Sequence, residues 1–169
     1  MATIILRPNG IGIETNIDLQ SPNSTEHWDK VDEVVADDAT TFVENKSGGA
    51  GVWQRDLYTI PVYSSSSGLI NSVTVYVRTR HNASDAKASI HTHSTTYDSP
   101  VLGGLSAWTT LSYSWTTNPY TGITWTWAEV DALQIGVSLN GSTAAPDWSR
   151  CTQVYVEIIT PFFPRIFYF

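Results

Sequence analysis

Three valines alternate with polar or amphipathic residues in the stretch VTVYVR, residues 73–78. A period of two places all three valines on one face of a strand, so this face is predicted to lie in a hydrophobic core. The same alternation recurs in LQIGVSL, residues 133–139, and in TQVYVEI, residues 152–158. Each of the three stretches is therefore predicted to form a strand with an aliphatic stripe and a polar stripe.

Weaker strand patterns occur in five further stretches, residues 3–6, 41–44, 54–60, 86–93 and 109–116. Turn-rich sequences separate the strands, such as residues 64–68 and the NPYTG sequence at residues 118–122. About eight short strands with this punctuation are typical of a β-sandwich. The sequence therefore predicts an all-β fold, a β-sandwich of two stacked sheets.

Two segments have helical features. The sequence TWAE at residues 126–129 matches a capping box, in which Thr126 and Glu129 each satisfy a free backbone amide, and one short helical turn is predicted near residues 127–133. The segment with Trp28, Val31, Val34 and Val35 has near-helical spacing, but aspartates flank it and strands surround it. Strand, loop and helix stay open there, and a strand is favoured.

Length and charge limit the classes of function. A chain of 169 residues suits one domain with a full core. The formal net charge is -7 with nine Lys and Arg in total, whereas nucleic-acid binding needs clustered positive charge, so we expect no nucleic-acid partner. The first residues lack a signal-peptide pattern, and no stretch is apolar over a bilayer-spanning length. We therefore expect synthesis in the cytoplasm and no membrane partner.

The composition changes abruptly near the C-terminus. Four of the five phenylalanines lie in the last ten residues, and Pro161 and Pro164 prevent this segment from continuing a central strand. The sequence therefore predicts a sandwich domain over residues 1–160 and an aromatic arm over residues 161–169. The arm either covers its own domain or inserts into a neighbour, and the second is favoured. The residues expected to make this assembly contact are Phe162, Phe163, Ile166, Phe167, Tyr168 and Phe169.

Abundant aromatic residues raise the possibility of sugar binding. Flat aromatic faces stack on sugar rings, and the chain has seven tryptophans and eight tyrosines. The candidates for contact with a glycan are Trp108, Trp115, Trp125, Trp127 and Trp148. The favoured alternative is that these large side chains fill the core or the ends of the sandwich.

Two patterns raise the possibility of a metal site. His91 and His93 would lie on the same face of a strand and could supply half of a zinc or copper site, but no third ligand is evident, so no metal or other cofactor is predicted. An acidic cluster could donate oxygens to calcium, but its spacing does not match an EF-hand loop, and solvated or turn-capping carboxylates are favoured. The cluster consists of Asp29, Asp32, Glu33, Asp37 and Asp38.

The sequence contains no recognisable catalytic motif. Nucleophile-elbow, phosphate-loop, zinc-protease and dinucleotide-binding patterns are all missing from it. Strand alternation places Cys151 on the same face as Gln153 and Tyr155, with Arg150 as the nearest basic residue, so an ordinary thiol is expected there. The chain is therefore not expected to be an enzyme, and a hydrolase is the most remote alternative.

Several segments together resemble a known group of proteins. They are LRPNG (6–10), WDKVDE (28–33), DDATT (37–41), WTTNP (115–119), TWTWAEVDALQIGV (124–137) and CTQVYVE (151–157). These segments resemble small jelly-roll-like proteins found among the structural genes of tailed phages and in environmental viral sequences. The resemblance covers nearly the whole chain and implies a jelly-roll-like sandwich without catalytic residues. The aromatic tail after Glu157 departs from the compact ending of that group.

The resemblance and the residue patterns together predict a non-enzymatic virion structural protein. It would be a capsid decoration, head-fibre or tail-associated protein on the virion surface. Its expected partners are copies of itself, a major capsid or tail protein, or both. The alternative is a lectin-like β-sandwich module that binds a glycan.

Overall fold

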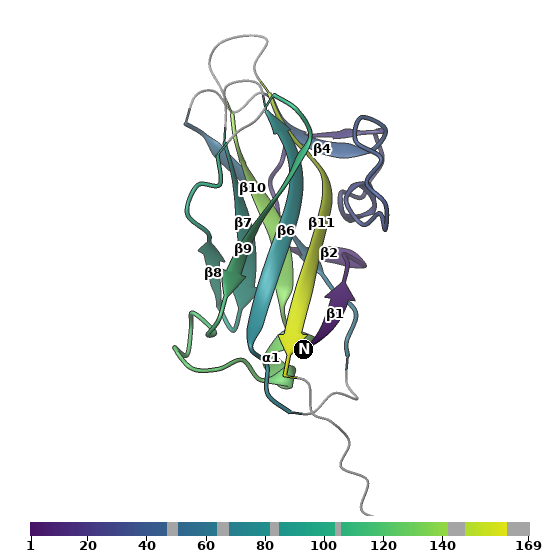
Figure 1. The fold of residues 1–169 in the computed structure, drawn as a ribbon. Helices are drawn as coiled ribbons and strands as arrows, with labels where there is room; N and C mark the ends of the chain where they lie inside the picture. Colours follow the sequence, from purple (N-terminus) through teal and green to yellow (C-terminus); the bar gives the residue numbers. More distant parts are fainter. Residues whose placement is uncertain (47–50, 64–67, 82–84, 104–105, 142–147, 162–169) are drawn as a thin grey trace, which may run out of the picture.

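The computed structural model describes residues 1–46, 51–63, 68–81, 85–103, 106–141 and 148–161. Two antiparallel sheets stack face to face in this structure (Figure 1). The predicted all-β, two-sheet sandwich is therefore confirmed. In the described ranges, no helix has both the length and the apolar character needed to cross a membrane.

The strands divide between the sheets in an order unlike their order in the chain. The first sheet runs β3 (Leu19–Ser21), β4 (Phe42–Asn45), β11 (Ser149–Thr160), β6 (Ser72–His81) and β9 (Thr109–Trp115), with β1 (Ala2–Leu6) also pairing with β11. The second sheet runs β2 (Gly10–Thr15), β5 (Trp53–Thr59), β10 (Gln134–Asn140), β7 (Ala86–Thr92) and β8 (Thr95–Asp98). The described ranges also contain two short helical segments, η1 (Trp28–Lys30) and α1 (Trp127–Asp131).

The core lies between the central strands of the two sheets. The three valines of β6 are fully buried, and β11 places Val156 opposite Val75 in the adjacent strand. From the second sheet, Ile135 and Val137 of β10 are also fully buried in the same cluster. Burying an aliphatic side chain of this size contributes about 1.5–3 kcal/mol, so these aliphatic stripes hold the sheets together. All eight predicted strands are confirmed, with small shifts of their ends.

Three short strands were not predicted: β2, β3 and β8. Strands β3 and β8 have three and four residues, too few for an alternating pattern to emerge. Strand β2 has the sequence GIGIET, in which glycines weaken the strand signal. A Cβ atom at Gly12 would collide with the Leu57 carbonyl of β5, so glycine is required by the close approach of these two strands.

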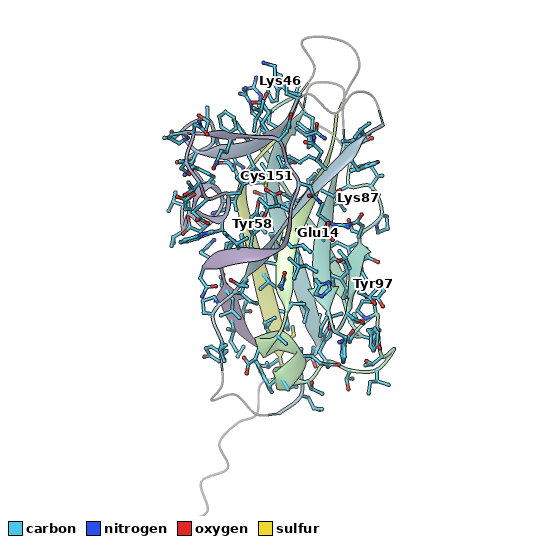
Figure 2. All side chains as sticks on the ribbon, turned by 180° about the vertical axis from the view of Figure 1, so that it is seen from behind. Glu14, Lys46, Tyr58, Lys87, Tyr97 and Cys151 are labelled. Atoms are coloured by element: carbon cyan, nitrogen blue, oxygen red, sulfur yellow. The ribbon has the colours of Figure 1, made fainter. Side chains whose placement is uncertain are left out.

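A β-bulge corrects the expected position of Cys151. The register of β11 against β6 shifts between Cys151 and Gln153, so the alternation predicted from the sequence does not continue through this point. The Cys151 side chain consequently lies in the core and is fully buried, near Tyr58 of the opposite sheet (Figure 2). Burial raises the pKa of its thiol to about 12. A protonated buried thiol has the properties expected of an ordinary cysteine.

The segment at residues 28–35 is not the strand that was favoured. Residues 28–30 form the 3-10 helix η1, and Val31 is fully buried while Val34 and Val35 are exposed. The Val31 carbonyl accepts a hydrogen bond from the Val154 amide at 2.8 Å. This amide lies on the edge of β11 between the residues that pair with β4 and those that pair with β1. The segment therefore fills a gap in the sheet instead of forming a strand.

Charged groups fasten the second sheet on its outer side. Arg55 of β5 donates to Glu14 of β2 at 2.8 Å and to Asp98 of β8 at 3.0 Å, which connects the two edge strands. Figure 2 shows Glu14 and Lys87 on this side of the molecule. A second anchor is the fully buried Asp56, which accepts from the Ile17 amide at 2.9 Å and contacts His27 at 2.6 Å. These contacts hold Ile17 and His27, which follow β2 in the chain, against β5.

His81, at the end of β6, generates a prediction about acid stability. Its ring is buried, Nδ1 lies 2.5 Å from the Ser149 hydroxyl, and Nε2 has no hydrogen-bond partner among the residues that the structure describes. Burial lowers the pKa of this imidazole from 6.5 to about 4. A lowered histidine pKa means that the unfolded state binds the proton more readily, so stability is lost as the pH falls from 6.5 towards 4.

We expect the titration of His81 to lower the unfolding free energy by about 3 kcal/mol between pH 7 and pH 4. Urea denaturation of the wild type and of His81→Asn at several pH values measures the loss. The variant should have a flatter pH dependence over this range, whereas Asn9→Ala, an exposed control without a titrating group, should keep the wild-type slope. Equal slopes for wild type and His81→Asn would contradict the prediction.

Candidate functional site

Three connections meet around α1 at one end of the sandwich. They are the turn between β7 and β8, the loop between β9 and α1, and the loop between β5 and β6. Figure 1 shows α1 at the same end as the N-terminus and the end of β11. We call this region the α1 end. It contains a pocket on one side of α1 and exposed apolar side chains on the other.

The helical turn α1 has the capping box that the sequence predicts. The Glu129 amide donates to the Thr126 hydroxyl at 3.3 Å, and the Thr126 amide donates to Oε2 of Glu129 at 2.7 Å. Val130 and Leu133 turn into the core. The predicted helical turn is confirmed. The hydrogen bonds of the capping box hold the Glu129 side chain in place at the α1 end.

Asn118 holds the loop between β9 and α1. Its side chain is fully buried, its Nδ2 donates to the Thr92 hydroxyl at 3.0 Å, and its Oδ1 accepts from the Tyr120 amide at 2.9 Å. The Gly122 amide donates to the Asn118 carbonyl at 2.8 Å and closes the turn predicted at residues 118–122. One asparagine thus ties this loop to the end of β7 and positions Tyr120.

His93 lies in the turn after β7, so the expected pairing with His91 on one strand face is wrong. Strand β7 ends at Thr92, and His93 has a positive φ of 55°. Its ring stacks on Tyr120 with the centroids 4.3 Å apart and the planes 11° from parallel, while His91 contacts Thr96 at 3.0 Å. Left-handed backbone at this turn therefore separates the two histidines. Over the ranges that the structure describes, no cluster of three or more potential ligands could hold a metal ion.

A pocket with a volume of about 220 Å³ opens between this turn and α1. It is lined by Thr92, His93, Ala128, Glu129 and Ala132. Nε2 of His93 and Oε1 of Glu129 lie 3.8 Å apart, too far for a direct hydrogen bond. The pocket therefore combines two polar atoms with the methyl groups of two alanines.

Apolar side chains are exposed on the opposite side of α1. Val62 is 63% exposed, Leu69 is 61% exposed and Tyr63 is 39% exposed. The Tyr63 ring lies 6.0 Å from that of Trp127, whose Nε1 donates to the Gly68 carbonyl at 3.1 Å. We call Val62, Tyr63 and Leu69 the α1-end patch.

The five tryptophans proposed for glycan contact do not form one surface. Trp115 and Trp125 are buried in the core, where Nε1 of Trp125 donates to the Trp115 carbonyl at 3.0 Å. Trp127 packs partly against the core, and Trp108 is half-buried. The guanidinium groups of Arg80 and Arg150 lie 5.3 Å and 4.1 Å from the centre of the Trp148 ring. Sequence reasoning did not find Tyr120, although its position in the NPYTG turn was a visible signal.

The remaining predicted residues divide between structural contacts and undescribed positions. Asp37 accepts from the Thr41 amide at 3.2 Å and from the Thr152 hydroxyl at 3.0 Å, and Asp38 pairs with Arg78 at 2.5 Å. Burial raises the pKa of Asp32 and, with partial compensation by its hydrogen bond from Thr41, that of Glu33. Phe162, Phe163, Ile166, Phe167, Tyr168 and Phe169 lie outside the described residues.

Comparisons with known proteins do not show a family for this chain. No family model and no curated protein matches the chain. Among solved structures, the chain is similar to the CBM22-1–GH10 modules of endo-1,4-beta-D-xylanase 10B from Clostridium thermocellum, complexed with xylohexaose, at 12% identity and a TM-score of 0.45. The match covers 94% of this chain and 30% of the xylanase chain, so this chain spans less than a third of that length. No function is carried over from so distant a likeness.

The role of Asn118 is testable by substitution. Asn118→Ala removes the donor to the Thr92 hydroxyl and the acceptor of the Tyr120 amide, so the unfolding free energy should fall by about 1–3 kcal/mol. Urea denaturation measures this change. Asn9→Ala, at an exposed position, should stay within about 0.5 kcal/mol of the wild type. If both variants were equally stable, Asn118 would not be the anchor of the loop.

Proposed function

We propose that this protein is a non-enzymatic assembly protein of a virion surface, and that copies join through the α1 end. The observation that carries the proposal is the position of the α1-end patch beside the point where the aromatic arm begins. The occupant proposed for the patch is the arm of a second copy, residues 161–169.

Exposure of the patch supports a contact surface. Val62 and Leu69 each leave more than half of their side-chain surface in water, and Tyr63 extends the apolar area. Single exposed apolar residues are ordinary, but a group of them beside a half-buried tryptophan is typical of surfaces that bind another protein. The Asp131 carboxylate accepts from the Tyr63 amide at 2.7 Å and so holds the backbone of the patch against α1.

The origin of the arm supports its role as the occupant. Strand β11 ends at Thr160, and the Ile159 carbonyl accepts from the Asn71 amide at 2.7 Å, next to the loop that carries Leu69. An extended segment of nine residues spans about 30 Å at most, which is enough to cross to a neighbouring molecule. Docking there would bury the apolar surface of its four phenylalanines, which would otherwise contact water.

The arm begins at the same end of the sandwich as the patch, which favours a closed assembly. A two-fold axis through the α1 end would bring each arm over the patch of the other copy. Such a reciprocal exchange closes on itself instead of forming an open fibre. The virion location is supported by the resemblance of the six sequence segments to phage structural proteins, and it adds a major capsid or tail protein as a further partner.

The assembly proposal is tested by size-exclusion chromatography with light scattering at matched concentrations. The full chain should form oligomers, whereas a truncation ending at Thr160 and the patch variant Leu69→Ser should be monomeric. Val34→Ser is the matched control, because Val34 is 77% exposed but lies outside the α1 end. The control should assemble like the wild type.

Two results would contradict the proposal. A monomeric full chain would mean that the arm does not join copies, and a full chain that is monomeric but more stable than the truncation would mean that the arm covers its own domain. Unchanged assembly of Leu69→Ser would mean that the arm docks elsewhere. The virion location has its own measurement, since mass spectrometry of purified particles should recover this chain in a constant ratio to the major capsid protein.

A further inference from the structure

We propose that the pocket between the β7–β8 turn and α1 binds one ring of a neutral sugar. This binding activity is separate from assembly and uses the opposite side of α1 from the α1-end patch. The residues that carry the inference are His93 and Glu129, which line the pocket, and Tyr120, which stacks on His93. None of them was a candidate for sugar contact in the sequence.

The polar atoms of the pocket are arranged as a donor and an acceptor. Oε2 of Glu129 is occupied by the amide and hydroxyl of Thr126, whereas Oε1 lies 3.8 Å from Nε2 of His93. Two such atoms that do not bond to each other both remain able to bond to a ligand. A sugar hydroxyl fits between them, because it donates and accepts at the same time.

The proposal uses the tautomer of His93 in which Nδ1 accepts a hydrogen bond from Thr92. The Thr92 hydroxyl accepts from Nδ2 of Asn118 at 3.0 Å and lies 3.1 Å from Nδ1 of His93, to which it can donate its own hydrogen. With Nδ1 as acceptor, the ring hydrogen lies on Nε2, so Nε2 is a donor towards the pocket. The stack with Tyr120 fixes the plane of the imidazole, and the donor is therefore oriented before a ligand arrives.

The apolar parts of the pocket suit the carbon face of a sugar ring. Ala128 of α1 and Ala132, the C-cap residue of α1, both line the pocket and present methyl groups. Tyr120 does not line the pocket, but it stacks on His93, which does. A volume of about 220 Å³ lies below the range of about 300–1,000 Å³ typical for drug-sized ligands, which favours a single ring.

Charge selects among small polar ligands. The Glu129 carboxylate lines the pocket and the whole chain carries a formal charge of -7, so phosphate, sulfate and acidic sugars are disfavoured. A small amine would satisfy Glu129 but would leave the Nε2 donor of His93 without an acceptor. A neutral polyhydroxylated ring satisfies both atoms.

Saturation-transfer NMR and chemical-shift titration with methyl glycosides of glucose, galactose, mannose and N-acetylglucosamine test the proposal on the full chain. At least one glycoside should bind. Tyr120→Ala removes the ring that orients His93, and Glu129→Gln removes the charged acceptor while its amide oxygen keeps the helix cap. Each variant should weaken binding at least tenfold. Tyr63→Ala is the matched control, since it removes an exposed tyrosine from the other side of α1 and should leave sugar affinity unchanged.

The outcomes separate this inference from the assembly proposal. If no glycoside binds, or if Tyr120→Ala and Glu129→Gln bind as tightly as the wild type, the sugar site is wrong whatever the oligomeric state. If methylammonium binds and every glycoside fails, the pocket is an amine site and the proposal is also wrong. Loss of assembly in Tyr63→Ala with intact sugar binding would show that the two surfaces work independently.

Discussion

The pairing of β6 with β11 is the constraint on which the rest of the structure depends. β11 pairs with β6 along most of its length, and the alternating valines of both strands face the second sheet. On its other edge, β11 pairs with β4 near Ser149 and with β1 near Thr160. Half of the strands in the first sheet therefore take their register from one twelve-residue strand. An error of one residue in this pairing would turn the aliphatic stripe towards water.

The acidic segment near residue 33 fills the gap between β4 and β1 on one edge of β11. Between β4 and β1, the backbone and side chains of β11 bond to a loop instead of a strand: the Val154 amide donates to the Val31 carbonyl, and Nε2 of Gln153 donates to the Glu33 carbonyl at 2.6 Å. The carboxylates of this segment then bond to Thr41, Thr152 and Arg78. A cluster that suggests calcium in the sequence thus has a structural use in the fold, because each of these bonds satisfies a polar group beside the sheet.

The α1 end contains both surfaces for which a binding role is proposed, the pocket and the α1-end patch. A single helical turn separates two surfaces of different chemistry: Trp127 and Asp131 face the β5–β6 loop, while Ala128, Glu129 and Ala132 face the β7–β8 turn. Side-chain hydrogen bonds from Asn118 and from the capping box hold these loops in place. Loops on a rigid sandwich are a common location for binding residues, since the sheets fix their ends while the tips stay variable.

The sequence by itself determined the class of the fold, the eight longer strands and the capped turn at Thr126, because side-chain alternation and capping chemistry are local properties. It also identified the residues of the core stripe, such as Val75 and Val156. Only the tertiary structure decided the bulge that buries Cys151, the turn that separates His93 from His91, and the meeting of His93, Tyr120 and Glu129. These features depend on strand pairing and on contacts between segments distant in the chain, and no local pattern encodes such pairings.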